Sequence, residues 1–324
     1  MADFSKIINR IDDAISVFIE RIPASQTDML HSLDEQLRKL DLSDGKIKPT
    51  VANLRLVSNI KSKLLKVILT DAYKSQVKQF LRAFNDITTL QNQYWKSVEK
   101  TFKPSSILKQ IKKITVEDTA AKLMEAGMES NVAEPIKQVL NTNITQGGSY
   151  RDMQKQIAGM VTTTLEGGVG LLDAYTKRIV IDSVNQYSRN YTQIASSDLG
   201  YEWYAYSNTL VETSRPFCKA MRELDYFHIS QIPDLLEAKD LYYTKKNKDG
   251  TTERLKVPLN PKTNLPEGMY PGTNVSNFLT LLGGYNCGHQ PRPVSANLVK
   301  MQEPVLYEKI INSSKYKSWK SASK

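Results

Sequence analysis

The chain has 324 residues, of which 40% are hydrophobic and 24% are charged, and its formal net charge is +10. These proportions indicate a folded protein of about two domains and argue against global disorder. No run approaches the roughly 20 consecutive apolar residues that a membrane-spanning helix needs. The first residues, MADFSKIINRIDD, have no apolar signal-peptide core. We therefore expect a protein that is made in a cytoplasm and has no membrane span.

Residues 1–130 are predicted to be helical and basic. Only four prolines precede residue 216, whereas nine follow in the last 109 residues, so long helices belong to the first part. Between Val57 and Ile87, apolar residues recur at steps of mostly three and four, which is the spacing of a buried helical face. Side chains that cap a first helical turn predict helix starts at Ser25, Thr115, Asn131 and Ser149.

The net charge is concentrated between Arg55 and Lys113. This stretch holds thirteen Lys and Arg residues against three acids, so it carries +10, and the rest of the chain is about neutral. Such a segment indicates an anionic neighbour, which is DNA, RNA or an acidic protein surface. A solvated lysine-rich helix face is an equally weighted alternative.

Residues 131–199 are predicted to form further helices. The sequence TQGGSYRDM is typical of a helix end, a glycine turn and a new helix start at Ser149. The stretch from LEGGVG to IASS then predicts a long helix, with six apolar or tyrosine side chains on one stripe.

Residues 200–300 are predicted to form a small β-rich domain with many loops. The alternating aromatic run YEWYAYSNTLVE favours a strand, and Asp249-Gly250 between two further runs predicts a hairpin. Residues 301–324 are predicted to be a basic tail. The predicted fold class is therefore α+β, with long helices in the N-terminal two thirds and a small β-rich C-terminal domain.

Two segments of this domain gather both cysteines of the chain and two of its three histidines. The four side chains form a Cys2His2 set, which suits a closed structural zinc site: Cys218, His228, Cys287 and His289. The first pair is ten residues apart, unlike the usual spacing of two to four. A Cys218–Cys287 disulfide formed in an oxidising medium, and two packed cysteines with unrelated histidines, remain as alternatives.

The sequence gives little support to an enzyme. It has no phosphate-binding glycine motif, no GxSxG and no HExxH. Cysteine–histidine nucleophilic chemistry at Cys218 or Cys287 lacks a recognisable orienting partner. We expect no catalytic residues.

A long helix, the segment YEWYAYSNTLVETSRPFCKAMRELDYF, a hairpin and GGYNCGHQPRPVS follow one another over roughly residues 130–300. In this order the C-terminal pattern resembles the minor head (head-morphogenesis) proteins of tailed bacteriophages, the family related to the F protein of phage Mu. The family's first turn is matched by Ser214, Arg215, Pro216 and Cys218. The second turn is matched by Asn286, Cys287 and His289, with His289 where many members have a second cysteine.

The chain departs from the family pattern at Val211, Tyr226 and Gly284, and residues 1–130 have no recognisable match. The resemblance implies structural turns at Arg215, Pro216 and Asn286. It also implies a non-enzymatic minor capsid protein, made in the host cytoplasm and present in several copies at the portal vertex and capsid interior. Its partners would be portal or capsid proteins and packaged double-stranded DNA, and its role would be in head morphogenesis, DNA packaging or ejection.

The basic stretch fits a protein that faces densely packed phosphate. The residues predicted for non-specific phosphate contact are Lys61, Lys63, Lys66, Lys74, Lys78 and Arg82. The alternative function is a zinc-dependent nucleic-acid-processing enzyme or toxin carried by a phage particle. A host DNA-binding protein with no virion role is a third hypothesis, weakened by the absence of a helix-turn-helix pattern.

Overall fold

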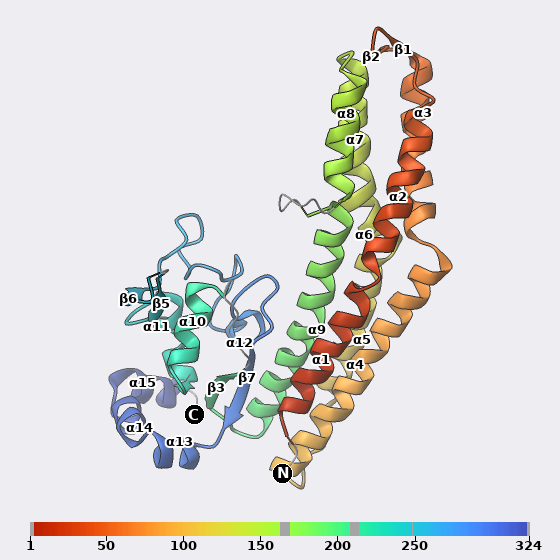
Figure 1. The fold of residues 1–324 in the computed structure, drawn as a ribbon. Coiled ribbons are helices and arrows are strands. Elements are labelled where there is room, and N and C mark those ends of the chain that lie inside the picture. The colour runs from red at the N-terminus through yellow and green to blue at the C-terminus, as the bar shows by residue number, and fades with distance from the viewer. Residues whose placement is uncertain (1–2, 163–168, 208–213, 248, 323–324) are drawn as a thin grey trace. The chain divides into compact units, whose positions relative to one another are not determined.

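The computed structural model describes residues 3–162, 169–207, 214–247 and 249–322. About 65% of the chain is helical, and small antiparallel sheets are concentrated between residues 203 and 294 (Figure 1). The predicted α+β class, with long helices first and a small sheet-containing C-terminal part, is confirmed.

The chain divides into two compact units that alternate along the sequence. Unit 1 contains residues 1–9, 87–112 and 182–324, and unit 2 contains residues 10–86 and 113–181. The boundaries between these units differ from the predicted ones at 130, 199 and 300. Each boundary between the units falls inside a long helix, where the composition of the sequence does not change.

Unit 2 is built from helices and one two-stranded ribbon. Its elements, four of which continue into unit 1, are α1 (Ser5–Ile19), α2 (Ile22–Leu37), β1 (Leu42–Ser43), β2 (Lys46–Ile47), α3 (Val51–Ile68), α4 (Asp71–Val98), α5 (Ser106–Leu123), α6 (Glu125–Met128), the π-helical turn η1 (Glu129–Ala133), α7 (Glu134–Thr145), α8 (Tyr150–Val161) and α9 (Leu171–Asp198).

The predicted apolar stripe between Val57 and Ile87 forms a buried face, but on two helices. Val57, Ile60, Leu64 and Ile68 are buried on α3, and the stripe resumes on α4 after a break at residues 69–70. Spacing of three and four residues shows that a face is apolar, and it does not show where a helix ends.

One of the four predicted helix starts is confirmed. The Ser149 hydroxyl accepts a hydrogen bond from the Asp152 amide and caps α8. The other three predictions are wrong: Ser25 lies inside α2, Thr115 inside α5 and Asn131 inside η1. In α2 the chain is already helical three residues earlier, with a proline in the first turn.

Unit 1 contains a three-stranded antiparallel sheet in the order β4-β3-β7. Trp203 pairs with Val294, and Tyr206 pairs with Pro291. Strand β7 is an edge strand with prolines at 291 and 293. Proline has no backbone N–H, and an edge strand tolerates this because one of its sides has no neighbouring strand to bond. The strands are β3 (Trp203–Ser207), β4 (Phe227–His228) and β7 (Gln290–Val294).

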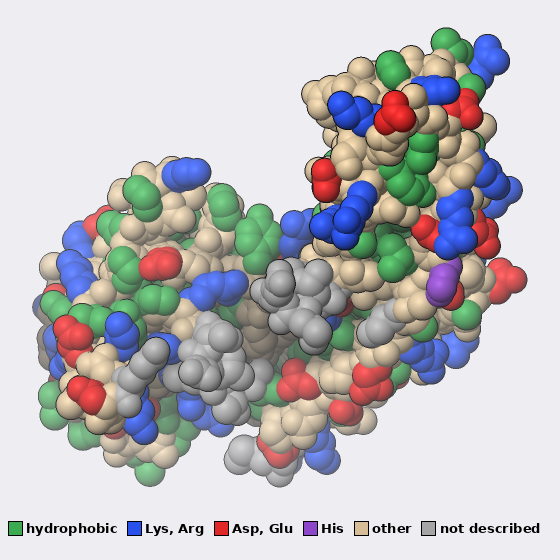
Figure 2. Space-filling model, turned by 45° about the horizontal axis from the view of Figure 1, so that its top comes forward, with side chains coloured by type: hydrophobic (Ala, Val, Ile, Leu, Met, Phe, Trp, Pro, Cys, Tyr) green, Lys and Arg blue, Asp and Glu red, His purple; other side chains and the backbone are tan. Residues whose placement is uncertain are grey.

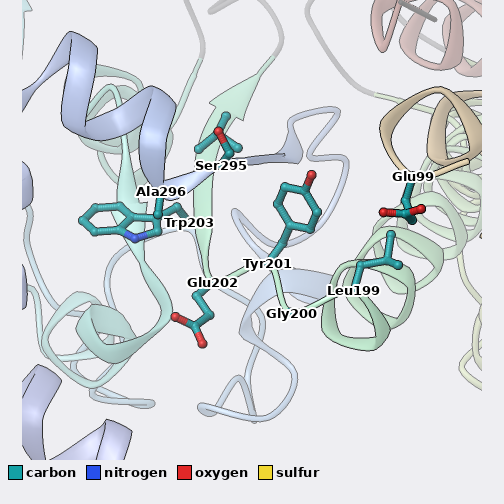
Figure 3. Close-up of a pocket in the computed structure, with 9 residues that line it drawn as sticks. Glu99, Leu199, Gly200, Tyr201, Glu202, Trp203, Ser295 and Ala296 are labelled. Atoms are coloured by element: carbon teal, nitrogen blue, oxygen red, sulfur yellow. The ribbon is translucent and has the colours of Figure 1, made fainter.

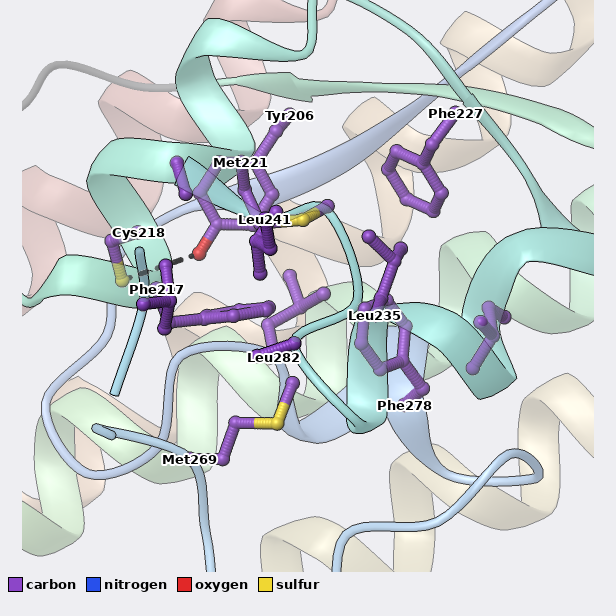
Figure 4. Packing of buried hydrophobic residues seen from close by; sticks show 14 of the residues in the cluster. Tyr206, Phe217, Cys218, Met221, Phe227, Leu235, Leu241, Met269, Phe278 and Leu282 are labelled. Atoms are coloured by element: carbon purple, nitrogen blue, oxygen red, sulfur yellow. Dashed lines mark hydrogen bonds between the residues drawn. The ribbon is translucent and has the colours of Figure 1, made fainter. Parts of the chain in front are cut away.

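The two faces of this sheet carry separate cores. Tyr204 and Tyr206 face one core, and Trp203 and Ala205 face the other. The first core is built largely from α10 (Pro216–Glu223), α11 (Ile232–Leu236) and α12 (Phe278–Leu281) (Figure 4). The second is covered by α13 (Ala296–Gln302), α14 (Pro304–Ile311) and α15 (Ser314–Ala322).

The predicted hairpin is confirmed, since β5 (Tyr242–Lys246) pairs antiparallel with β6 (Thr252–Lys256) around Gly250. Residues 301–324, predicted as a basic tail, contain α14 and α15 within the described part. Tyr307 of α14 stacks on Trp203, so this segment packs on the sheet.

Candidate metal centre at the paired Cys and His segments

Three of the four predicted metal ligands meet beside the first face of the sheet. Cys218 lies in the first turn of α10, Cys287 in the turn before β7, and His289 next to the first residue of β7. The Cys218 and Cys287 sulfurs and a His289 ring nitrogen all lie within 4.8 Å of one another, and all three side chains are buried. A metal ion could be held by this group.

The hydroxyl group of Tyr206, on β3, contacts both sulfurs. Its oxygen lies 3.4 Å from the Cys218 sulfur (Figure 4). The same oxygen lies 3.6 Å from the Cys287 sulfur. The Cys287 sulfur lies 3.5 Å from His289 Nδ1, and the His289 ring stacks on the Tyr206 ring. Neither cysteine is in a disulfide.

Gly283 allows its backbone to lie close to the two sulfurs. A Cβ atom at this position would lie 2.4 Å from the Cys218 sulfur, 2.9 Å from the Cys287 sulfur and 3.2 Å from the Tyr206 hydroxyl. A side chain therefore cannot be placed there without displacing the group.

Two arginines hold the loop that carries Cys287. Arg189, on α9 and fully buried, donates to the carbonyl oxygens of Cys287 and His289. Arg215 donates to the carbonyls of Gly283 at 2.8 Å and Tyr285 at 2.6 Å. The sequence suggested a turn role for Arg215 but gave no reason to single out Arg189, which lies in the middle of a helix.

The residues implied as structural turns take up the following positions. Arg215 is the N-cap residue of α10, and Pro216 begins the helix. Asn286 has a left-handed backbone (φ 57°), which asparagine tolerates, and its backbone N–H donates to the Asp182 carboxylate at 2.6 Å.

The two sulfurs differ in proton affinity. A hydrogen bond from Cys218 lowers the pKa of Cys287 well below its usual value, with further help from the Arg189 charge and His289, although burial opposes the change. The same hydrogen bond, together with burial, raises the pKa of Cys218. Burial above all raises the pKa of Tyr206. The two thiols therefore titrate as a pair, and Cys287 is the more readily deprotonated of the two.

The fourth predicted ligand, His228, does not join the group. It pairs with Trp203 on the other face of the sheet, where its ring contacts Trp203, Tyr316 and Trp319. Its Nδ1 accepts from the Ser230 amide, so Nε2 carries the proton and faces Glu202 at 3.4 Å. Side chains alternate along a strand, so Trp203 and Tyr206 lie on opposite faces of the sheet. His228 is the cross-strand partner of Trp203 and therefore shares the face of Trp203.

The six basic residues predicted to contact phosphate lie in unit 2 and have different surroundings. Lys61 pairs with Glu129 and Glu134, and Lys63 donates to Gln36. Lys74 is half-buried and lies on one stripe of α4 with two exposed cations, Lys78 and Arg82, at steps of four.

Lys66 is exposed on α3. Within the described ranges Lys66, Lys74, Lys78 and Arg82 form no ion pair. On the face shown in Figure 2, Lys and Arg side chains are interspersed with Asp and Glu.

A cavity of about 300 Å³ lies at the end of α9 and the start of β3. Its lining includes two carboxylates, Glu99 and Glu202, which lie on opposite sides of Tyr201 (Figure 3). They do not form the close pair that acid–base chemistry between carboxylates requires.

None of the protein-family models, curated proteins or solved structures compared with this chain matches it. Among the described residues, no helix combines the length and apolar character needed to cross a bilayer.

Proposed function

We propose that this chain is a structural protein of a tailed-phage particle, a minor capsid protein that acts at the portal and capsid interior during head morphogenesis and DNA packaging or ejection. One observation carries the proposal. The two segments on which the resemblance rests, more than sixty residues apart, meet at one buried group of Cys218, Cys287 and His289. Such a meeting is expected if the segments are two halves of one structural feature.

The group serves as a structural zinc site. Two thiolates and an imidazole are the donors that zinc prefers, and Cys287 already favours the deprotonated form that binds metal. All three side chains are buried in the core beside the sheet, so the ion would join α10 to the loop before β7 and stabilise the domain. Burial supports this role over the alternative of a zinc-dependent enzyme, which needs a position open to substrate.

The zinc site is tested by elemental analysis of the reduced protein and of Cys218→Ser and Cys287→Ser. We expect about one zinc per chain in the wild type and none in either variant, because two remaining donors are too few for a stable site. With zinc at about 100 times its dissociation constant, its removal should lower the free energy of unfolding by about 3 kcal/mol. Metal-free wild-type protein with a Cys218–Cys287 cross-link would instead support the disulfide.

The helices of unit 2 contact duplex DNA without sequence preference. The support for this is the set of exposed cations without ion pairs among the described residues, Lys66, Lys78 and Arg82. Lys61 is paired with Glu129, so it can contact DNA phosphate only if that ion pair breaks.

The virion role is tested by quantitative mass spectrometry of particles from the source of this chain, purified after nuclease treatment. The chain should sediment with DNA-filled heads at a few copies per particle. Particles assembled with Cys218→Ser should lose it, whereas those with Lys245→Ala, an exposed hairpin change, should keep it. Absence of the chain from particles, together with metal-dependent nuclease activity in the free protein, would favour the enzyme hypothesis.

A further inference from the structure

We propose that the phenol oxygen of Tyr206 is the fourth ligand of the metal, which gives a Cys2HisTyr site. This inference rests on the zinc site proposed above and assigns the position for which the sequence suggested His228. Tyr206 is fully buried on the central strand of the sheet, and its hydroxyl contacts both sulfurs.

The distances between donor atoms match a tetrahedral site. Bonds of about 2.3 Å to sulfur and about 2.0 Å to nitrogen or oxygen place two such donors about 3.5 Å apart at a tetrahedral angle. The hydroxyl oxygen of Tyr206 lies 3.4 Å from the Cys218 sulfur and 3.6 Å from the Cys287 sulfur. The Cys287 sulfur and His289 Nδ1 are 3.5 Å apart. Three edges of the tetrahedron are thus already formed.

Three of these donors lie close to the backbone of Gly283. A Cβ atom at this position would lie 2.4 Å from the Cys218 sulfur, 2.9 Å from the Cys287 sulfur and 3.2 Å from the Tyr206 hydroxyl. A larger residue at 283 would therefore displace the donors and obstruct the site.

The charge balance also favours a phenolate. Arg189 is 1% exposed and donates to the carbonyl oxygens of Cys287, His289 and Thr280, and within the described ranges it forms no ion pair. A buried cation needs a compensating negative charge. A divalent ion with two thiolates, a neutral imidazole and a phenolate carries −1, which balances Arg189. A neutral fourth ligand would leave the metal group without net charge beside Arg189.

Other side chains near the group are engaged elsewhere. His228 lies on the opposite face of the sheet. The Asp182 carboxylate accepts hydrogen bonds from the Asn286 amide and the Tyr270 hydroxyl. When the ion binds, the protons held by the thiols and the phenol pass to solvent.

The test uses the full chain with Zn²⁺ and Co²⁺, comparing Tyr206→Phe with Tyr204→Phe. Tyr204 is the matched control, because it lies in the same core two residues away and its hydroxyl contacts Ser196 and not the sulfurs. Metal addition to the wild type and to Tyr204→Phe should give a tyrosinate difference spectrum in the ultraviolet, and Tyr206→Phe should not. Zinc affinity, measured by chelator competition, should fall in Tyr206→Phe by more than the roughly 10- to 100-fold that the loss of an outer-shell partner costs.

The outcomes separate the two proposals. If the wild type binds no metal, the zinc site itself is wrong. If it binds metal with no tyrosinate signal, and Tyr206→Phe leaves the Co²⁺ ligand-field bands unchanged, zinc stands and Tyr206 is only a hydrogen-bond donor to the sulfurs, which overturns this inference. A wild type that binds no metal and holds a closed Cys218–Cys287 disulfide would contradict both.

Discussion

At the scale of single residues, Arg189 connects the long helix α9 to the loop that carries Cys287. Its guanidinium donates to the backbone carbonyls of Cys287, His289 and Thr280. The nearby Asp182 holds the same loop through the Asn286 amide. One face of a helix therefore fixes the position of two of the proposed ligands.

Gly283→Ala should destabilise the metal-free protein and abolish zinc binding. The new methyl group would lie 2.4 Å from the Cys218 sulfur, so either the loop or the sulfur must move. We expect a loss of about 1–3 kcal/mol in urea unfolding, as for overpacked cores. The matched control is Gly159→Ala on α8, where nothing lies within 4 Å and stability should rise by up to about 1 kcal/mol.

Stability should fall as the pH drops below about 6.5, the ordinary pKa of histidine. Burial lowers the pKa of His228 in the folded state, although Glu202 opposes the change. Below pH 6.5 the unfolded chain therefore binds a proton at His228 that the folded chain does not bind. The contribution of His228 to the free energy of unfolding is complete above pH 6.5 and is lost as the pH falls through the folded pKa. Urea unfolding at pH 7.5 and 5.5 checks this.

His228→Asn provides the control for that experiment, because its amide oxygen can still accept from the Ser230 amide. The variant should lose less stability than the wild type between the two pH values. Equal losses would show that other groups control the pH dependence.

At the scale of elements, the start of α8 is fixed by local chemistry. Ser149→Ala should lower the free energy of unfolding by about 1 kcal/mol, because the Asp152 amide loses its acceptor. Ser25→Ala is the matched control, since Ser25 lies inside α2 and alanine is the better helix former. The control should be neutral or slightly stabilising. A similar loss in both variants would argue against the cap.

Prolines mark several helix starts in unit 1. Pro216, Pro233 and Pro304 each lie in the first turn of a helix, where the missing amide proton has no partner to lose. The proline-rich composition after residue 216 correctly predicts that the helices among the described residues there are short. It also favoured loops and a tail over the short helices that are present, because composition alone does not show whether a proline begins a helix or interrupts one.

At the scale of the whole molecule, the charge distribution predicts DNA binding. The triple variant Lys66→Glu, Lys78→Glu and Arg82→Glu should weaken binding to duplex DNA. The slope of log affinity against log salt should become shallower by about 0.9 for each phosphate that the protein no longer neutralises. Fluorescence anisotropy over a range of salt concentrations measures both quantities.

The matched control for that experiment is Lys245→Glu, Lys246→Glu and Lys256→Glu, which makes the same charge change on the exposed hairpin of unit 1. Equal effects from both triple variants would mean that only net charge matters and would contradict a DNA-binding face on α3 and α4.

The sequence by itself determined the fold class, the buried stripe of α3, the cap of α8 and the hairpin, because each depends on residues a few positions apart. It also singled out Cys218, Cys287 and His289 by their chemistry. Only the tertiary structure decided that these three meet, that His228 lies on the opposite face of the sheet, and that Tyr206, Gly283 and Arg189 surround the group. Those relations depend on strand register and on interactions between residues about one hundred positions apart, which local patterns do not encode.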